Sequence, residues 1–183
     1  MIAQNLAHIR KQITQCECHS ETQSAVKLLA VSKTKPIEDI LTAYEAGQMA
    51  FGENYVQEGV EKIQFCQQQR IELEWHFIGP LQSNKTRLVA EYFDWMQTLE
   101  RAKIADRLNE QRPPHKAPLN VLIQVNISNE ASKSGVQPDD ILPLAKHVEN
   151  LPHLRLRGLM AIPAPTDNIA EQEAAFSQME QLF

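Results

Sequence analysis

Near the amino end of the chain, a lysine lies just beyond the carboxyl end of a short apolar run. Residues 27–36 read Lys-Leu-Leu-Ala-Val-Ser-Lys-Thr-Lys-Pro. The run over 28–31 predicts a strand that is buried on both faces, as in a parallel sheet covered by helices. Alternation along this strand places Lys33 on the same side as Leu29 and Val31, at the strand's carboxyl end.

An amine in this place is suited to attack on an aldehyde. Only the neutral amine is a nucleophile, and at an ordinary pKa of about 10.4 a lysine is almost entirely charged at pH 7. Burial disfavours the ammonium form, so the predicted position makes Lys33 a candidate Schiff-base lysine. The alternative is a strand-end lysine that only reaches for solvent.

Bulk composition excludes several classes of protein. The 183 residues carry a net charge of -5, which argues against an electrostatic nucleic-acid binder. There is no apolar run long enough to span a membrane, and the first residues do not form a signal peptide, so we expect a cytoplasmic protein. The three cysteines are consistent with reduced thiols in the cytoplasm. Cys16, Cys18 and His19 form one weak cluster, and we predict no metal site.

Hydrophobic periodicity predicts helices that alternate with short strands. An amphipathic helix over 1–16 comes first, and strands follow over 28–32, 49–52, 75–78, 95–99, 121–127 and 156–162. This alternation implies parallel strands in a single domain, 1–183. No glycine-rich nucleotide-binding loop follows the first strand. The sequence therefore predicts an α/β fold, a TIM-like (β/α) barrel with six of the eight units.

Polar residues gather where the predicted strands end. Asn54, the 83–85 loop and Lys133 join Lys33 in this respect. In a βα barrel the carboxyl ends of all strands meet at one face, where such folds carry their active sites. Asn54 and His76 are candidates for the pocket floor, and the alternative for His76 is a hydrogen-bonded core residue. The alternative for Ser83 is a helix cap.

Five blocks of the chain carry a family likeness. They are LAVSKTKP at 29–36, FGENYVQE at 51–58, WHFIGPLQSNK at 75–85, SKSG at 132–135 and RGLMAI at 157–162. Together they resemble the pyridoxal phosphate homeostasis protein family, which is related to the barrel domain of alanine racemase. The resemblance covers nearly the whole chain, with the blocks in the family's order.

The resemblance implies a function and a site. In that family the lysine at the position of Lys33 forms an internal aldimine with pyridoxal 5′-phosphate, and the protein serves vitamin B6 homeostasis without catalytic turnover. The expected cofactor-binding residues here are Lys33, Asn54, Ser83 and Met160. Pyridoxal phosphate-dependent apo-enzymes are the expected recipients. Family members continue with two more strands that hold the phosphate, so the resemblance implies weak cofactor retention by this chain.

Three other functions remain open from sequence. A pyridoxal phosphate-dependent amino-acid racemase needs a base on each face of the cofactor, one of them a tyrosine from a second domain. A Schiff-base aldolase would attack its substrate's carbonyl directly with the lysine. A non-functional fragment would leave sheet edges unpaired.

Overall fold

The structure is a computed structural model that describes residues 1–17, 25–128 and 134–183. Strands and helices alternate along the chain, and the strand order follows the chain order, β1 to β6. Every strand pairing described is parallel. These features confirm the predicted α/β class with six barrel-like units. The chain divides into two compact units, Met1–Trp75 and His76–Phe183.

The first unit holds the two strands whose ends carry Lys33 and Asn54. Its elements are α1 (Ile2–Glu17), β1 (Ala30–Val31), α2 (Ile37–Glu45), β2 (Ala50–Glu53) and α3 (Val56–Gln68). Ala30 of β1 pairs with Phe51 of β2. The strand β3 (Glu74–Phe77) begins here, where the amide of Glu74 donates to the carbonyl of Met49 at 2.8 Å.

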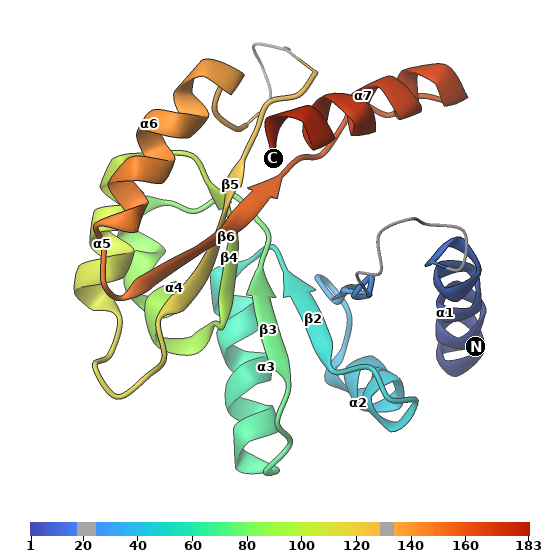
Figure 1. Cartoon of the computed structure of the whole chain (residues 1–183). Helices are drawn as coiled ribbons and strands as arrows, with labels where there is room; N and C mark the ends of the chain where they lie inside the picture. The colour runs from blue at the N-terminus through green and yellow to red at the C-terminus, as the bar shows by residue number, and fades with distance from the viewer. Residues whose placement is uncertain (18–24, 129–133) are drawn as a thin grey trace. The chain divides into compact units, whose positions relative to one another are not determined.

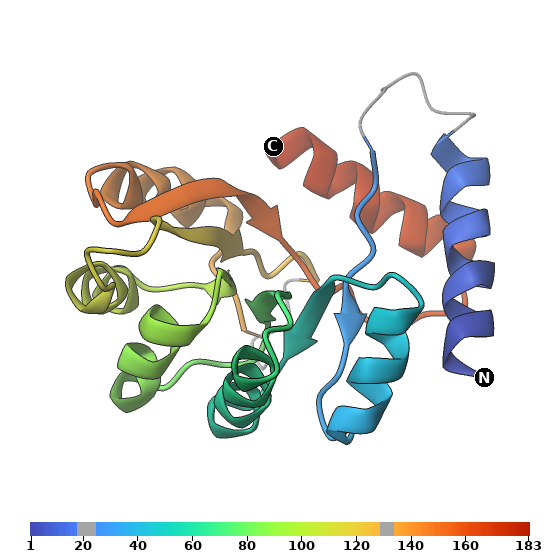
Figure 2. The ribbon, with the colours of Figure 1, turned by 90° about the horizontal axis from the view of Figure 1, so that it is seen from below.

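The second unit contains the end of β3 and three further strand–helix units. Its elements are η1 (Ser83–Lys85), α4 (Thr86–Tyr92), β4 (Trp95–Leu99), α5 (Ala102–Gln111), β5 (Leu119–Gln124), α6 (Pro138–Glu149), β6 (Leu154–Met160) and α7 (Ile169–Leu182). Helices α4, α5 and α6 lie on one side of strands β4, β5 and β6 (Figures 1 and 2). This is the layer order that parallel βα units produce.

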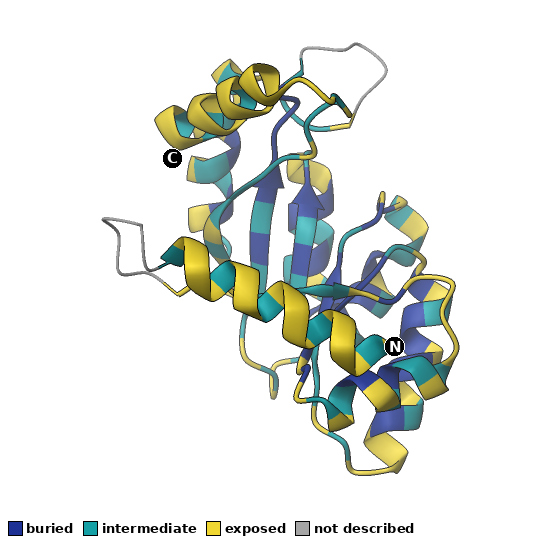
Figure 3. Ribbon diagram, turned by 90° about the vertical axis from the view of Figure 1, so that its right-hand side faces the viewer, coloured by how far each residue is buried: buried dark blue, intermediate teal, exposed yellow. Residues whose placement is uncertain are grey.

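Buried residues concentrate along the strands and on the helix faces turned towards them (Figure 3). In the second unit, Phe77 and Phe93 meet edge to face with ring centroids 5.6 Å apart, and both are fully buried. By contrast, none of the residues of α1 or α7 is buried. None of the helices in the described parts of the chain is both long and apolar enough to cross a membrane.

The first strand differs from its prediction. It contains two residues rather than five, and Val31 is 51% exposed, so the prediction of a strand buried on both faces is wrong. The physical reason is that β1 lies at the end of the strand order, where β2 is its one neighbour. An apolar run alone does not distinguish such a position from a central one.

Candidate functional site

Lys33 lies in a tight turn that directly follows β1. The amide of Lys35 donates to the carbonyl of Ser32 at 3.0 Å and closes the turn. Within it, Thr34 has a positive φ of 59°, which is uncommon for a β-branched residue. The side chain of Lys33 is exposed, so the prediction that it is buried is wrong. The strand ends at Val31, and the alternation on which that prediction rested does not continue through the turn.

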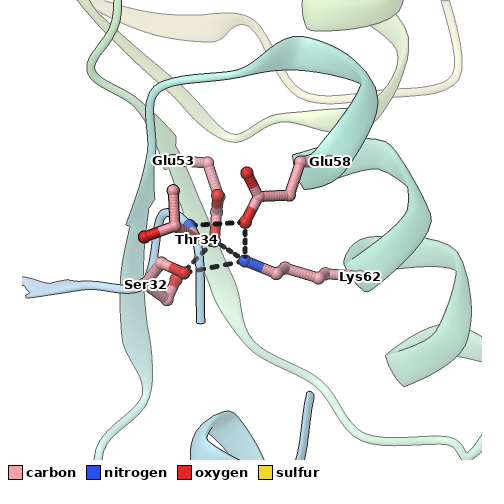
Figure 4. Close-up of polar contacts among 5 residues, drawn as sticks. All are labelled: Ser32, Thr34, Glu53, Glu58 and Lys62. Atoms are coloured by element: carbon pink, nitrogen blue, oxygen red, sulfur yellow. Dashed lines mark hydrogen bonds and ion pairs between the residues drawn. The ribbon is translucent and has the colours of Figure 1, made fainter. Parts of the chain in front are cut away.

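A buried lysine from α3 lies beneath this turn. Lys62 is 8% exposed. Its ammonium donates to the carbonyl of Ser32 at 2.7 Å, to Oε1 of Glu53 at 2.8 Å and to Oε1 of Glu58 at 2.6 Å. Figure 4 shows these contacts converging on the Nζ atom.

Two further hydrogen bonds complete the cluster. The hydroxyl of Ser32 donates to Oε1 of Glu53 at 2.6 Å, and the amide of Thr34 donates to Oε1 of Glu58 at 2.6 Å. We call Ser32, Thr34, Glu53, Glu58 and Lys62 the Lys62 cluster. It joins the turn after β1, the end of β2 and the first two turns of α3 (Figure 4).

Glu53 is the most deeply buried member of the Lys62 cluster, with no exposed surface. Burial raises the pKa of its carboxyl above the ordinary value of 4.5, while the hydrogen bonds from Lys62 and Ser32 act in the opposite direction. Its Oε2 has no hydrogen-bond partner among the described residues. The carboxylate form of Glu53 is therefore costly and depends on the ammonium of Lys62.

Asn54 follows β2 directly and is partly exposed as a residue. Its Oδ1 atom is nevertheless buried and has no donor within the described structure. An unpaired buried carbonyl oxygen costs free energy, so this atom is suited to accept a hydrogen bond from a ligand or a water molecule. The sequence-predicted residues Lys33 and Asn54 thus both lie in the first unit, Lys33 two residues after β1 and Asn54 directly after β2.

Ser83 and Met160 belong to the second unit. Ser83 begins η1, and its carbonyl accepts a hydrogen bond from the hydroxyl of Thr86 at 2.9 Å. Neither η1 nor α4 has a side-chain cap, so the alternative of Ser83 as a helix cap is wrong. Met160 is the last residue of β6 and is half-buried, and its carbonyl accepts from the amide of Val125 at 2.8 Å.

His76 of β3 takes part in a stacked group of side chains in the second unit. Its ring lies parallel to that of Trp95, with centroids 5.1 Å apart, and the guanidinium of Arg157 lies 5.8 Å from the Trp95 ring centre. The side-chain amide nitrogen of Gln97 lies 2.8 Å from Nδ1 of His76. Because His76 is also 5% exposed, these contacts favour the hydrogen-bonded core histidine over a free pocket-floor group.

The SKSG block lies partly outside the described residues, and Lys133 is among those not described. Gly135 is described and has a positive φ of 114°. A Cβ atom there would lie 2.7 Å from the backbone nitrogen of Asn126, so glycine is required by close approach as well as by conformation. Its amide donates to Oε2 of Glu100 at 2.9 Å, which fixes the end of this loop to the end of β4.

The sequence prediction did not assign a role to Glu53, Glu58 or Lys62. One signal was available. Glu58 and Lys62 are four residues apart in a predicted helix, and Lys62 directly precedes Ile63 of that helix's apolar stripe. This spacing predicts an ion pair within the helix, but it does not distinguish a buried pair from an exposed one.

Metal ligands do not gather in the described residues, where no group of three His, Cys, Asp or Glu side chains is placed to hold an ion. Cys16 is exposed near the end of α1. Cys18 and His19, which the sequence places beside it, fall outside the described residues.

Comparison with known proteins gives consistent matches over the whole chain. The family model described as "Alanine racemase, N-terminal domain" matches residues 4–183. A pyridoxal phosphate homeostasis protein of Haemophilus influenzae is 74% identical over 183 residues, which cover all of this chain and 77% of the relative. The protein of the same name from Escherichia coli K12 is 56% identical, with coverage of 100% of this chain and 79% of the relative.

Solved structures agree with this. The structure of PipY from Synechococcus elongatus PCC7942 with PLP bound has a TM-score of 0.83 and 32% identity, and the match covers 100% of this chain and 80% of PipY. An alanine racemase of Clostridium difficile shares the fold alone, at 16% identity and a TM-score of 0.69, with 97% of this chain and 47% of the racemase covered. The chain therefore belongs to the pyridoxal phosphate homeostasis protein family, within the alanine racemase N-terminal domain fold.

Proposed function

We propose that this protein binds pyridoxal 5′-phosphate through a covalent bond to Lys33. The observation that carries the proposal is the placement of Lys33 in a hydrogen-bonded turn after β1, with its amine free of the ion pairs described nearby. The PipY structure with PLP bound supports it, because that protein aligns with the whole of this chain.

The bond is an imine, formed with a balanced exchange of atoms. The neutral Nζ of Lys33 attacks the cofactor's aldehyde carbon, the nitrogen gives up two protons, and the aldehyde oxygen leaves with them as water. Water reverses the reaction and returns the aldehyde and the amine, whereas another amine displaces Lys33 and takes over the imine. Asn54 fits a place beside the cofactor because its buried Oδ1 lacks a donor in the described structure. Ser83 and Met160 stay predicted cofactor contacts, and each is open to test by its own alanine variant.

We propose that the bound cofactor is held for release rather than for turnover. An exposed Lys33 leaves its imine open to water and to incoming amines, which favours exchange. Release of the aldehyde to pyridoxal phosphate-dependent apo-enzymes would use this property, and we place the protein in the cytoplasm as one domain, 1–183. The alternative, an amino-acid racemase, rests on the match to the alanine racemase N-terminal domain model and on the fold shared with an alanine racemase at 16% identity.

An absorbance titration with pyridoxal phosphate tests the proposal. Wild-type protein should develop an imine band at the edge of the visible range, and Lys33→Ala should not. Lys35→Ala is the matched control, since Lys35 is an exposed lysine two residues further along. A band of unchanged size in Lys33→Ala would overturn the assignment. Racemisation of alanine above the background of the free cofactor would replace the carrier role with an enzymatic one.

A further inference from the structure

We propose that Glu58 and Lys62 are positioning residues for Lys33, fixing the two peptide groups on either side of it. The proposal rests on the proposed role of Lys33 in cofactor binding. It concerns how the reactive lysine is presented, since neither Glu58 nor Lys62 contacts the Lys33 side chain in the interactions described.

The contacts fall on consecutive peptide groups. The carbonyl of Ser32 belongs to the peptide group before Lys33 and accepts from Lys62 at 2.7 Å. The amide of Thr34 belongs to the peptide group after it and donates to Glu58 at 2.6 Å. The two α3 side chains are themselves paired at 2.6 Å. Figure 4 shows the contacts of Lys62 with Ser32 and of Glu58 with Thr34. The backbone of Lys33 is thus held on both sides, and Lys33 itself is exposed.

The turn needs such support. Thr34 occupies the left-handed region, which costs a non-glycine residue free energy and favours relaxation to another conformation. The hydrogen bond from its amide to Glu58 exists only while the turn keeps its present form. Loss of this contact would let the residues around Lys33 sample more conformations, which lowers the fraction of time in which the amine is presented correctly.

Because Lys62 is more deeply buried than Glu58, substitution of Lys62 should disturb folding more than substitution of Glu58. Lys62 is 8% exposed and also pairs with the fully buried Glu53, so its removal disturbs the core. The side chain of Glu58 is 27% exposed, and its loss leaves the Lys62–Glu53 pair in place. Glu58→Ala is therefore the variant that frees the turn with the least effect on folding.

The matched control lies on the same helix. Glu61→Ala removes the same charge, but Glu61 is exposed and its described contact is a long one to Gln57, at 3.4 Å. Glu58→Gln is the conservative variant, because an amide oxygen still accepts from the Thr34 amide. Two measurements apply to each variant. One is amide hydrogen exchange at Thr34 in cofactor-free protein, and the other is the rate of borohydride-trapped labelling of Lys33 by pyridoxal phosphate.

We expect Glu58→Ala to speed Thr34 exchange and to slow labelling of Lys33 by roughly tenfold, the effect of releasing one ordered residue. Glu61→Ala should match wild type in both, and Glu58→Gln should restore most of the labelling rate. Equal labelling in wild type, Glu58→Ala and Glu61→Ala would overturn the positioning role while leaving Lys33 as the cofactor's lysine. An absence of label on wild-type Lys33 would instead refute the proposed function.

Discussion

Removal of the Lys62 ammonium should destabilise the protein in a way that depends steeply on pH. Lys62→Met keeps most of the side-chain volume but leaves Glu53, which has no exposed surface, without its cation. Burial already raises the pKa of Glu53. Without Lys62 the pKa rises further, because the hydrogen bond and charge that lower it are gone.

The ordinary pKa of 4.5 sets a ceiling on this cost. A buried carboxylate can avoid the cost of its buried charge by taking up a proton, and this protonation costs about 1.36 kcal/mol for each pH unit above that value. The ceiling is about 4 kcal/mol at pH 7.5 and under about 1 kcal/mol at pH 5.0. A raised folded-state pKa means that stability is present at low pH and lost as the pH rises. The lost hydrogen bond to the Ser32 carbonyl adds about 1 kcal/mol at either pH.

Urea unfolding followed by circular dichroism at pH 5.0 and pH 7.5 measures the difference. Lys62→Met should lose about 3 to 5 kcal/mol at pH 7.5 and about 1 to 2 kcal/mol at pH 5.0. The double variant Lys62→Met/Glu53→Gln should remove most of this pH dependence. Lys103→Met, at an exposed position on α5, is the charge control. Equal losses at both pH values would refute the reasoning, since they would show that Glu53 carries no buried charge.

Two further predictions concern buried groups of the fold. Arg112 is 6% exposed and donates to the carbonyls of Ala90, Phe93 and Ala117. Arg112→Met should therefore lower the free energy of unfolding by about 3 to 5 kcal/mol in urea titrations. A loss under about 1 kcal/mol would contradict this. Burial raises the pKa of the Cys66 thiol, whereas Cys16 is exposed. Iodoacetamide should therefore modify Cys16 in the folded protein and spare Cys66, which peptide mass mapping measures. Rapid modification of Cys66 would count against its burial.

The sequence predicts the order and type of the elements well because periodicity and turn residues are local signals. Strand β4 coincides with its predicted range, 95–99, and β3 differs by one residue at each end. Strand β1 is the clear failure. Its apolar residues resemble those of a central strand, and its exposure follows from its place in the strand order, which no local pattern records.

In the candidate site too, local sequence patterns predict some residues, whereas others depend on tertiary structure. The sequence predicts Lys33 and Asn54 as site residues because each comes after a strand within a family block, and this assignment stays a prediction. The Lys62 cluster is not found, because it depends on a register between β1, β2 and α3 that brings Glu53 and Lys62 within 2.8 Å. The exposure of Lys33 is likewise a property of the turn rather than of the strand before it. The reactivity that we propose for Lys33 therefore rests on its presentation in that turn and not on burial by the chain.

The most direct test of the proposed function is whether pyridoxal phosphate becomes bonded to Lys33. Incubation of the protein with pyridoxal phosphate, reduction with borohydride and mass mapping of the peptides measures this directly. We expect a reduced pyridoxyl group on Lys33 at an early time, with little on other lysines. Label that accumulates on Lys85 or Lys133 while Lys33 stays unmodified would contradict it.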